Sequence, residues 1–171
     1  MRLPLAWLRT YVDLPEDVDA IAEKLSMLGF PVESIERKPP LSGVVVGRIT
    51  SVEKHPNADR LQVCSIDIGA DKPLTIATAA TNVAAGQWIP VAKIGAVLPQ
   101  VTIAPRKMRG VESEGMLCSA EELALPAEWF EDGIMQLDEV LALGTDVVDA
   151  FGLREPILEI EITTNRADAM S

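Results

Sequence analysis

A proline-rich segment divides this chain into two stretches whose apolar residues follow different periods. The segment is Lys38-Pro39-Pro40-Leu41-Ser42-Gly43. Its adjacent prolines exclude a helix and remove amide donors that a sheet would need. Before it, apolar residues recur at the helical spacings of three and four, whereas after it β-branched and polar residues partly alternate, as in strands. The sequence therefore predicts a domain boundary here.

The stretch before the boundary has the pattern of one amphipathic helix followed by a short strand. Asp17 is a good N-cap, and Gly29 can adopt the left-handed conformation that ends a helix. Between them, the apolar residues fall on one helix face: Val18, Ile21, Ala22, Leu25 and Leu28. Phe30-Pro31-Val32 then leaves the helix in an extended direction, and we expect the strand to end near Arg37.

The stretch after the boundary predicts a small closed barrel. β-Branched residues fill 44–52, and apolar and polar residues alternate over 61–68, which is the pattern of a half-buried sheet. Five or so short strands of this kind favour a barrel. The acidic stretch 119–130 predicts one helical turn and a loop outside it. Further short strands are expected at 74–77, 88–92 and around 101–103.

The end of the chain predicts one more strand, because Leu158, Ile160 and Ile162 fall on one face and glutamates on the other. We expect the two chain ends to form one domain that is interrupted by the barrel. The chain stops without a terminating signal, which indicates a piece of a longer protein. The predicted fold class is α+β and mostly β, with a small α+β domain over 1–40 and 151–171 and an inserted barrel over 41–150.

The charge of the chain is unevenly distributed. The net charge of −11 argues against general binding to nucleic acid, DNA included, or to an anionic membrane surface. However, residues 41–110 carry 8 basic and 4 acidic side chains, whereas residues 111–150 carry 0 and 11. The barrel is therefore expected to have a basic part. Since the apolar runs are too short for a membrane span or a signal peptide, we expect a cytoplasmic protein.

No catalytic, cofactor-binding or metal-binding set of residues can be nominated. The sequence lacks a P-loop and a Gly-x-Gly-x-x-Gly motif after a strand, so nucleotide binding has no support. His55, the only histidine, lies beside a proline in a predicted turn, where it fits a turn or backbone-capping role better than a triad with Ser113. Cys64 and Cys118 stand far apart without a CxxC motif, and we expect buried free thiols.

Two segments of the predicted barrel form a more specific pattern. The first, HPNADRL, covers 55–61 between two predicted strands, and the second, KMRGVESEGMLCS, covers 107–119. In this order they resemble the paired signature of the tRNA-binding OB-fold module, which occurs in methionyl- and phenylalanyl-tRNA synthetases and in free-standing tRNA-binding proteins. The resemblance implies that the predicted barrel is a five-stranded OB fold.

The flanks of the barrel narrow the resemblance. The segments PLAWLRTYV at 4–12 and LEIEITTNRAD at 158–168 are similar to the opening of the bacterial phenylalanyl-tRNA synthetase beta subunit. The resemblance thus covers essentially the whole chain. Two residues depart from the family pattern: Thr164 stands where the family usually has proline, and Ala79 stands where it usually has glycine. Both departures concern the shape of the backbone more than chemistry.

The resemblance implies an (αβ)₂ enzyme that uses ATP and magnesium (Mg²⁺) to esterify phenylalanine to tRNA(Phe). In that family the active site belongs to the alpha subunit, and editing belongs to a later domain of the beta subunit. This chain is therefore expected to be a non-catalytic module with no cofactor of its own. Its expected partners are tRNA(Phe) and the alpha subunit in an (αβ)₂ heterotetramer, with no membrane and no DNA contact.

The candidate tRNA-binding residues are cations of the barrel region and polar residues of the motifs: Arg48, Lys54, Asn57, Arg60, Asn82, Lys93, Arg106, Lys107, Arg109 and Ser113. Apart from His55, Trp88 is the only aromatic residue of 41–110, so binding is expected to be led by shape, weak and sensitive to salt. On a strand, Lys107 and Arg109 would share a face and form one cationic patch.

Structural interpretations of the same motifs stay open. HPNADRL makes a good turn without RNA, because proline fixes φ and polar side chains can bond to their own backbone. Gly110 and Gly115 can serve backbone shape, with Ser113 as a cap and the cations in solvent. The segment 165–168 can fix a turn, or face RNA or the alpha subunit. Two other functions also stay open: a subunit-interaction module without direct RNA contact, and a free-standing tRNA-binding or chaperone-like protein.

Overall fold

The chain divides into two compact units in the computed structural model: Met1–Lys38 with Arg154–Ser171, and Pro39–Leu153. The structure describes three ranges of residues, 1–125, 132–137 and 141–162. Three features predicted from the sequence fall outside those ranges: the last part of the acidic stretch (126–130), Thr164 and the turn at 165–168.

In the first unit, the predicted helix forms as α2 (Val18–Met27). The Asp17 side chain accepts hydrogen bonds from two free backbone N–H groups of the first turn, as an N-cap does. At the other end, Gly29 has a φ of +87°, and the N–H of Phe30 donates to the carbonyl of Leu25 at 3.0 Å, which completes a Schellman ending. No helix in the described ranges is long and apolar enough to cross a membrane.

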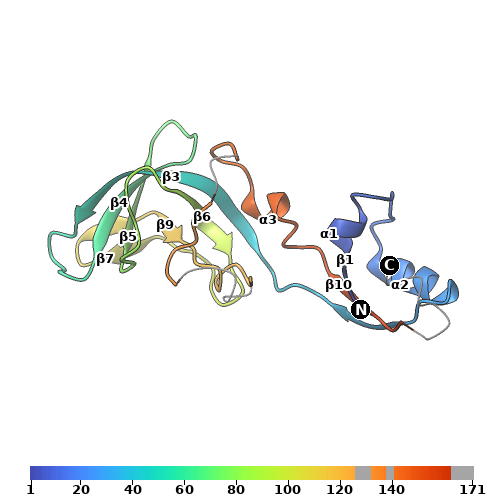
Figure 1. The fold of residues 1–171 in the computed structure, drawn as a ribbon. Helices are drawn as coiled ribbons and strands as arrows, with labels where there is room; N and C mark the ends of the chain where they lie inside the picture. The colour runs from blue at the N-terminus through green and yellow to red at the C-terminus, as the bar shows by residue number, and fades with distance from the viewer. Residues whose placement is uncertain (126–131, 138–140, 163–171) are drawn as a thin grey trace. The chain divides into compact units, whose positions relative to one another are not determined.

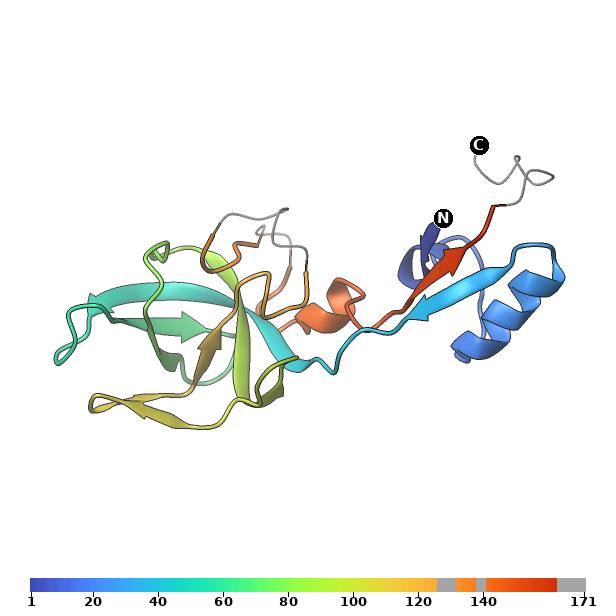
Figure 2. The same cartoon turned by 90° about the horizontal axis from the view of Figure 1, so that it is seen from below.

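The first unit also contains a three-stranded antiparallel sheet that uses both ends of the chain. Its central strand is β10 (Ile157–Ile160), which lies between β1 (Arg2–Pro4) and β2 (Val32–Glu36). A short helix, α1 (Leu5–Leu8), follows β1, and Figure 2 shows α2 beside the sheet. The sequence predicted β2 and β10 but not β1, because three residues are too few to reveal a period.

The core of the first unit is small. Its buried apolar side chains come from β1, α1, α2 and β10: Leu3, Leu5, Ile21, Leu158 and Ile160. Leu28, which the sequence placed on the same helix face as Ile21, is 59% exposed because the helix ends there. This unit therefore rests on few fully buried groups.

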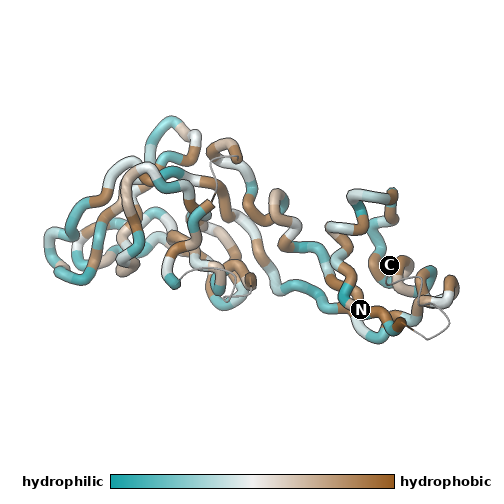
Figure 3. The backbone as a smooth tube through the Cα atoms, in the orientation of Figure 1, coloured by the Kyte–Doolittle hydropathy of each residue, from teal (hydrophilic) through white to brown (hydrophobic). Residues whose placement is uncertain are grey.

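The second unit is a strongly curved antiparallel sheet of five strands in the order β5-β4-β3-β6-β9 (Figure 1). Hydrophobic and hydrophilic residues are interspersed along the chain of this unit (Figure 3). Buried and less buried residues alternate over most of β4, whereas β3 and β6 each contain four consecutive buried residues, so both faces of the sheet are covered there. The arrangement confirms the predicted mostly-β fold with a five-stranded OB-like barrel. The strands are β3 (Ser42–Lys54), β4 (Gln62–Asp67), β5 (Leu74–Thr78), β6 (Trp88–Val97) and β9 (Gly115–Leu117).

The barrel is nearly closed by contacts between β5 and the residues just before β9. The N–H of Glu114 donates to the carbonyl of Thr75 at 2.8 Å, and the Glu114 carboxylate accepts from the N–H of Thr75 at 2.9 Å. The hydroxyl of Ser113 accepts from the N–H of Ala77 and donates to the carbonyl of Gly115, both at 3.1 Å. Polar side chains thus replace part of the missing backbone ladder.

One of the predicted barrel strands is wrong. Residues 101–103 contribute only a bridge between Thr102 and Val97, and the fifth strand of the sheet is β9. Between β6 and β9 the chain forms a separate hairpin of β7 (Arg106–Met108) and β8 (Val111–Ser113). Each of these strands has three residues, so the apolar pattern could not reveal them.

The segment after β9 is tied back to the barrel by backbone hydrogen bonds. The N–H of Leu137 donates to the carbonyl of Trp88 at 2.7 Å, and the N–H of Val46 donates to the carbonyl of Thr145 at 2.9 Å. A short helix, α3 (Val147–Ala150), follows. In the predicted acidic loop, residues 120–124 form turns. These bonds bring the two ends of the barrel segment together.

Both cysteines lie in the core of the barrel, and the prediction of buried free thiols is confirmed. Burial raises the pKa of Cys64. At Cys118, burial and the nearby negative charge of Glu122 raise the pKa to about 12, against a smaller lowering by a hydrogen bond from the backbone of Ala92. Both thiols therefore stay protonated at neutral pH.

Candidate nucleic-acid interface

The loop between β3 and β4 is fastened to the β7–β8 hairpin by two side chains of the HPNADRL segment. The ring of His55 is buried, and its Nε2 lies 2.9 Å from the carbonyl oxygen of Met108. The side-chain amide of Asn57 donates to the carbonyl oxygen of Arg109 at 3.1 Å. The partners stand 53 and 52 residues apart in the sequence. The two signature segments therefore meet at one edge of the barrel.

The hydrogen bonds of His55 define where its proton lies. Nδ1 accepts from the N–H of Asn57 at 3.0 Å, so this nitrogen carries no proton. Nε2 must then carry the proton and donate it to Met108. The ring caps the backbone of its own turn, as the sequence predicted, but the second bond could not be read from the sequence. Both nitrogens serve the structure of the loop and the hairpin.

The tip of the β7–β8 hairpin is the two-residue turn Arg109-Gly110, which connects the paired residues Met108 and Val111. Both turn residues have positive φ, +46° and +103°, as in a type I′ turn. Arg109 therefore does not continue the strand that carries Lys107. The prediction that these two cations lie on one strand is wrong, because β7 ends at Met108 and Arg109 is the first residue of the turn. That the two cations act as one patch stays a prediction.

A cavity of about 390 Å³ lies at the junction of the loop and the hairpin tip. Arg60 from the loop and Arg109 from the tip both line it, together with Ala58, Asp59 and Leu61. Both arginines are exposed. The spacing of the residues could not have paired Arg60 with Arg109, because only the bonds from His55 and Asn57 bring the two segments together.

All seven cations among the predicted site residues lie on the surface of the barrel. None of them forms an ion pair with a residue in the described ranges, whereas Arg2, Arg9, Arg37 and Lys38 of the first unit each do. The seven cations are distributed over β3, the β3–β4 loop, β6, β7 and the hairpin tip: Arg48, Lys54, Arg60, Lys93, Arg106, Lys107 and Arg109.

Arg48 lies over the indole ring of Trp88, with Cζ 6.0 Å from the ring centroid. The two residues are cross-strand partners on β3 and β6, and Trp88 also packs against the core. A guanidinium at this distance makes a cation–π contact. The indole face is therefore covered by Arg48 rather than open to a stacking base.

Two other predicted site residues are built into the barrel. Ser113 is 4% exposed, and its hydroxyl makes the two closing hydrogen bonds described above. The side chain of Asn82 forms a reciprocal pair with the backbone of Ile134, donating at 2.9 Å and accepting at 3.0 Å. Ala79 is not among the residues with positive φ, so the glycine usual in the family is not required for backbone shape there.

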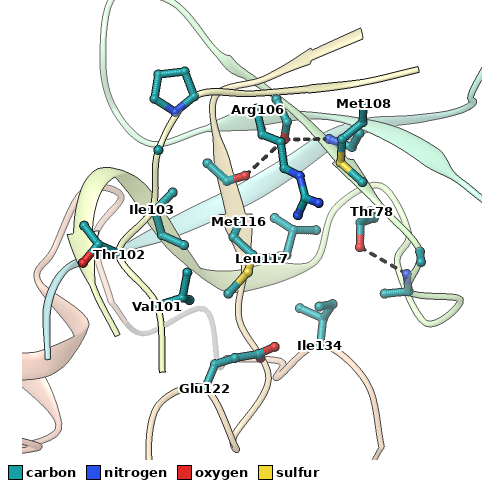
Figure 4. A pocket seen from close by; sticks show the side chains of 17 residues that line it. Thr78, Val101, Thr102, Ile103, Arg106, Met108, Met116, Leu117, Glu122 and Ile134 are labelled. Atoms are coloured by element: carbon teal, nitrogen blue, oxygen red, sulfur yellow. Dashed lines mark hydrogen bonds between the residues drawn. The ribbon is translucent and has the colours of Figure 1, made fainter. Parts of the chain in front are cut away.

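A larger pocket of about 500 Å³ lies between β5, residues 101–106 and the start of β9. Figure 4 shows Met116, Leu117 and Ile134 among its apolar side chains. Its charged lining residues are Arg106 and Glu122, which have opposite signs. Unlike the cavity at the hairpin tip, this pocket offers a phosphate no net positive charge.

Several acidic side chains of the barrel accept hydrogen bonds from backbone amides. The Asp146 carboxylate accepts from the N–H of Val148 at 2.8 Å and so caps α3. Asp67 accepts from the N–H of Gly69 at 2.8 Å, and Glu122 bonds to Ser119. Together with Glu114, these acids stabilise turns and barrel closure.

Within 1–125, 132–137 and 141–162, no three His, Cys, Asp or Glu side chains lie close enough together to hold a metal ion. Enzymes that use nucleotides often hold Mg²⁺ with only one or two carboxylates together with the phosphates of the substrate. We assign no step to ATP or Mg²⁺ in this chain.

Comparison with known proteins gives matches along the whole chain. The family described as "Putative tRNA binding domain" matches residues 44–146. Over its full length the chain is 48% identical to the phenylalanine–tRNA ligase beta subunit of Synechococcus sp. (strain CC9902) and 47% identical to that of Trichormus variabilis, and it spans 22% and 21% of them. The crystal structure of a MetRS related protein from Pyrococcus horikoshii overlaps 80% of this chain and 99% of that one, with 24% identity and a TM-score of 0.45. The sequence matches confirm the family resemblance.

Proposed function

Because this chain belongs to the tRNA-binding domain family, we propose that its barrel binds tRNA through the β3–β4 loop and the β7–β8 hairpin. The observation that carries the proposal is the set of seven exposed cations on β3, the β3–β4 loop, β6 and the β7–β8 hairpin that have no ion-pair partner in the described ranges. Phosphates of a nucleic acid supply the missing counter-charge and release bound ions as they do so. This surface suits an RNA backbone rather than a particular base sequence.

The proposed contact depends on charge and shape more than on stacking. The indole of Trp88 is covered by Arg48, so it is not an open platform for a base. Stacking of bases on aromatic rings supplies much of the affinity in other single-strand binders. Without it, the affinity rests on phosphate contacts and falls steeply as salt rises.

We further propose that the chain is part of the beta subunit of a phenylalanine–tRNA ligase. Its identity of 48% and 47% to two such subunits supports this, although it spans only about a fifth of their length. The whole enzyme would charge tRNA(Phe) with phenylalanine by using ATP and Mg²⁺, in an (αβ)₂ heterotetramer with the alpha subunit. This chain would be the non-catalytic part that holds tRNA.

A second candidate function is subunit interaction without RNA contact. It is favoured by the 11 acidic and 0 basic residues of 111–150, which would repel phosphate. Against it, Glu114, Glu122 and Asp146 are already engaged with backbone amides. The two functions differ in one measurable property, the dependence of RNA binding on salt.

A titration of the 171-residue chain with tRNA(Phe) at 50 and 200 mM salt tests the proposal. We expect measurable affinity that falls linearly in a log–log plot against salt. Lys107→Ala, on the exposed face of β7, should lower that slope by about 1, because it removes one phosphate contact. The control is Lys72→Ala, an exposed cation in the turn between β4 and β5, which should leave the slope unchanged. Absence of binding at 50 mM would refute RNA binding and favour the assembly function.

A further inference from the structure

We propose that Arg60 and Arg109 form one clamp for a single backbone phosphate, and that His55 and Asn57 are positioning residues that set the geometry of this clamp. The inference rests on the proposed function and adds to it a site, a ligand group and the residues that build the site. Arg60 and Arg109 come from segments that the chain separates by 48 residues of sequence, yet they line the same cavity.

The first argument is how firmly the two segments are joined. The ring of His55 bonds on one side to the loop itself and on the other to the carbonyl of Met108, at 3.0 and 2.9 Å. Asn57 adds a bond to the carbonyl of Arg109 at 3.1 Å. The carbonyls of Met108 and Arg109, which lie before and after the Cα of Arg109, are thus both held by hydrogen bonds. The backbone that carries the Arg109 side chain is fixed relative to the loop that carries Arg60.

The second argument is the backbone conformation of Arg109. Its φ of +46° is left-handed, a region that glycine, asparagine and aspartate enter far more readily than arginine. The next residue is Gly110, and glycine is favoured at the second position of such a turn. An arginine kept in an unfavourable conformation points to a use for its side chain, and only its carbonyl is used within the fold.

The third argument is the chemistry of the cavity. Its charged lining residues are Arg60, Arg109 and Asp59, so the net charge of the lining residues is positive. None of its five described lining residues is aromatic, which disfavours a base and favours a phosphate. Arginine forms paired hydrogen bonds to phosphate oxygens, and two arginines can hold one phosphate from two sides.

The test compares Arg60→Ala, Arg109→Ala and the double variant of the full chain in titrations with tRNA(Phe). If both arginines hold one phosphate, each single change should weaken binding by about tenfold. The double change should then weaken it by clearly less than the product of the two, and it should lower the salt slope by about 1 rather than about 2. Independent, multiplicative effects with a slope change of about 2 would overturn the shared clamp.

Arg109→Gly separates binding from folding. Glycine adopts the positive φ without strain, so the melting temperature should stay the same or rise. The tRNA affinity should fall as much as in Arg109→Ala. Unchanged affinity in this well-folded variant would remove Arg109 from the site. Because wild-type binding is measured alongside, loss of the clamp is distinguishable from a failure of tRNA binding altogether.

The positioning role is tested by Asn57→Ala in two backgrounds. In the wild-type background the variant should weaken tRNA binding, because the Arg109 backbone is released. In the Arg109→Ala background it should have no further effect, since the group that it positions is absent. A purely structural role would weaken binding equally in both backgrounds, and that result would overturn the assignment. Lys72→Ala again serves as the matched surface control.

Discussion

The two units of this chain treat their surface cations in opposite ways. In the three-stranded unit, Arg2 and Lys38 pair with Glu36, Arg37 pairs with Asp19 at 2.8 Å, and Arg9 pairs with Glu155 at 3.3 Å. In the barrel, none of the eight exposed lysines and arginines pairs with a described residue. The net charge of −11 thus combines a unit in which four cations pair with acids and a barrel in which none does so among the described residues. Whole-chain charge is therefore a poor guide to what such a protein binds.

The difference does not come from a shortage of acids in the barrel. Its acidic side chains cap turns, a helix and the barrel seam through backbone N–H groups. A carboxylate that accepts backbone hydrogen bonds is held in place and cannot swing to a nearby cation. The barrel thus uses several of its acids to stabilise loops, whereas four cations of the three-stranded unit form ion pairs with acids of the same unit.

The largest expected effect is a loss of stability caused by a substitution in the core of one unit, with tRNA binding by the other unit unchanged. Leu158 is fully buried at the centre of β10, in a core of five buried side chains. Leu158→Ala should destabilise the three-stranded unit by about 2–5 kcal/mol, because a cavity is left that this small core cannot fill. The tRNA affinity should stay within about twofold, since the barrel has its own core. Thermal unfolding followed by circular dichroism, together with tRNA titration, measures both.

The contradicting outcome for Leu158→Ala is a parallel loss of barrel structure and of tRNA binding. A matched variant in the barrel is Ile76→Ala, which is also fully buried. It should abolish or strongly weaken tRNA binding at a similar cost in stability. If both variants lowered tRNA binding equally, the units would not be independent in function.

A smaller effect should appear at alkaline pH and only in the barrel, which contains both thiols. The pKa of Cys118 rises from 9.0 to about 12 on folding, so the buried thiol stabilises the fold fully below pH 9. That contribution is lost between pH 9 and pH 12, because the unfolded chain ionises first. At pH 10 the loss is about 1 kcal/mol.

Cys118→Ala is the comparison that isolates this thiol. Urea unfolding at pH 8 and pH 10 should show a smaller decrease in stability for the variant than for the wild type. All other ionisable groups are the same in the two proteins and cancel in the difference. Equal decreases would mean that the ionisation of Cys118 is not coupled to folding.

The smallest effect concerns the ion pairs that distinguish the two surfaces. Asp19→Asn with Glu36→Gln releases Arg37, Arg2 and Lys38 from their partners. Exposed pairs contribute little, so stability should fall by less than about 1 kcal/mol. At low salt the tRNA affinity should rise by about two- to threefold, because the first unit then also carries free cations. No gain in affinity would show that free charge alone is insufficient without the geometry of the barrel.

Much of the fold could be predicted from local patterns. Asp17 and Gly29 marked the ends of α2, and alternation marked β4 and β10, because caps and periods act within a few residues. Residues 101–103 have the composition of a strand but form only a bridge. The strand that pairs with the outer edge of β6 is β9, and this pairing depends on closure of the barrel, which a local sequence pattern does not reveal.

The candidate site was harder to predict than the fold. The sequence identified the two motifs and the cations, but it paired Lys107 with Arg109 by strand spacing. The positive φ at Arg109 ends the strand, and the contact of His55 with Met108 joins residues 53 apart. An Arg-Gly pair is a weaker turn signal than Asn-Gly, so the hairpin tip left little trace in the sequence.

Because β10 lies between β1 and β2, the three-stranded sheet cannot form until the ribosome has synthesised β10. The ribosome makes β2 about 120 residues before β10, a wait of roughly 6–24 s at typical translation rates. During that time the barrel can form, and the pairing of Val45 with Asp146 brings its two ends together. The loop that β10 must close then shrinks from about 120 to about 20 effective residues, which lowers the entropic cost by about 1.6 kcal/mol. A change that delays the barrel would leave two unpaired strands on the nascent chain, open to the wrong neighbours.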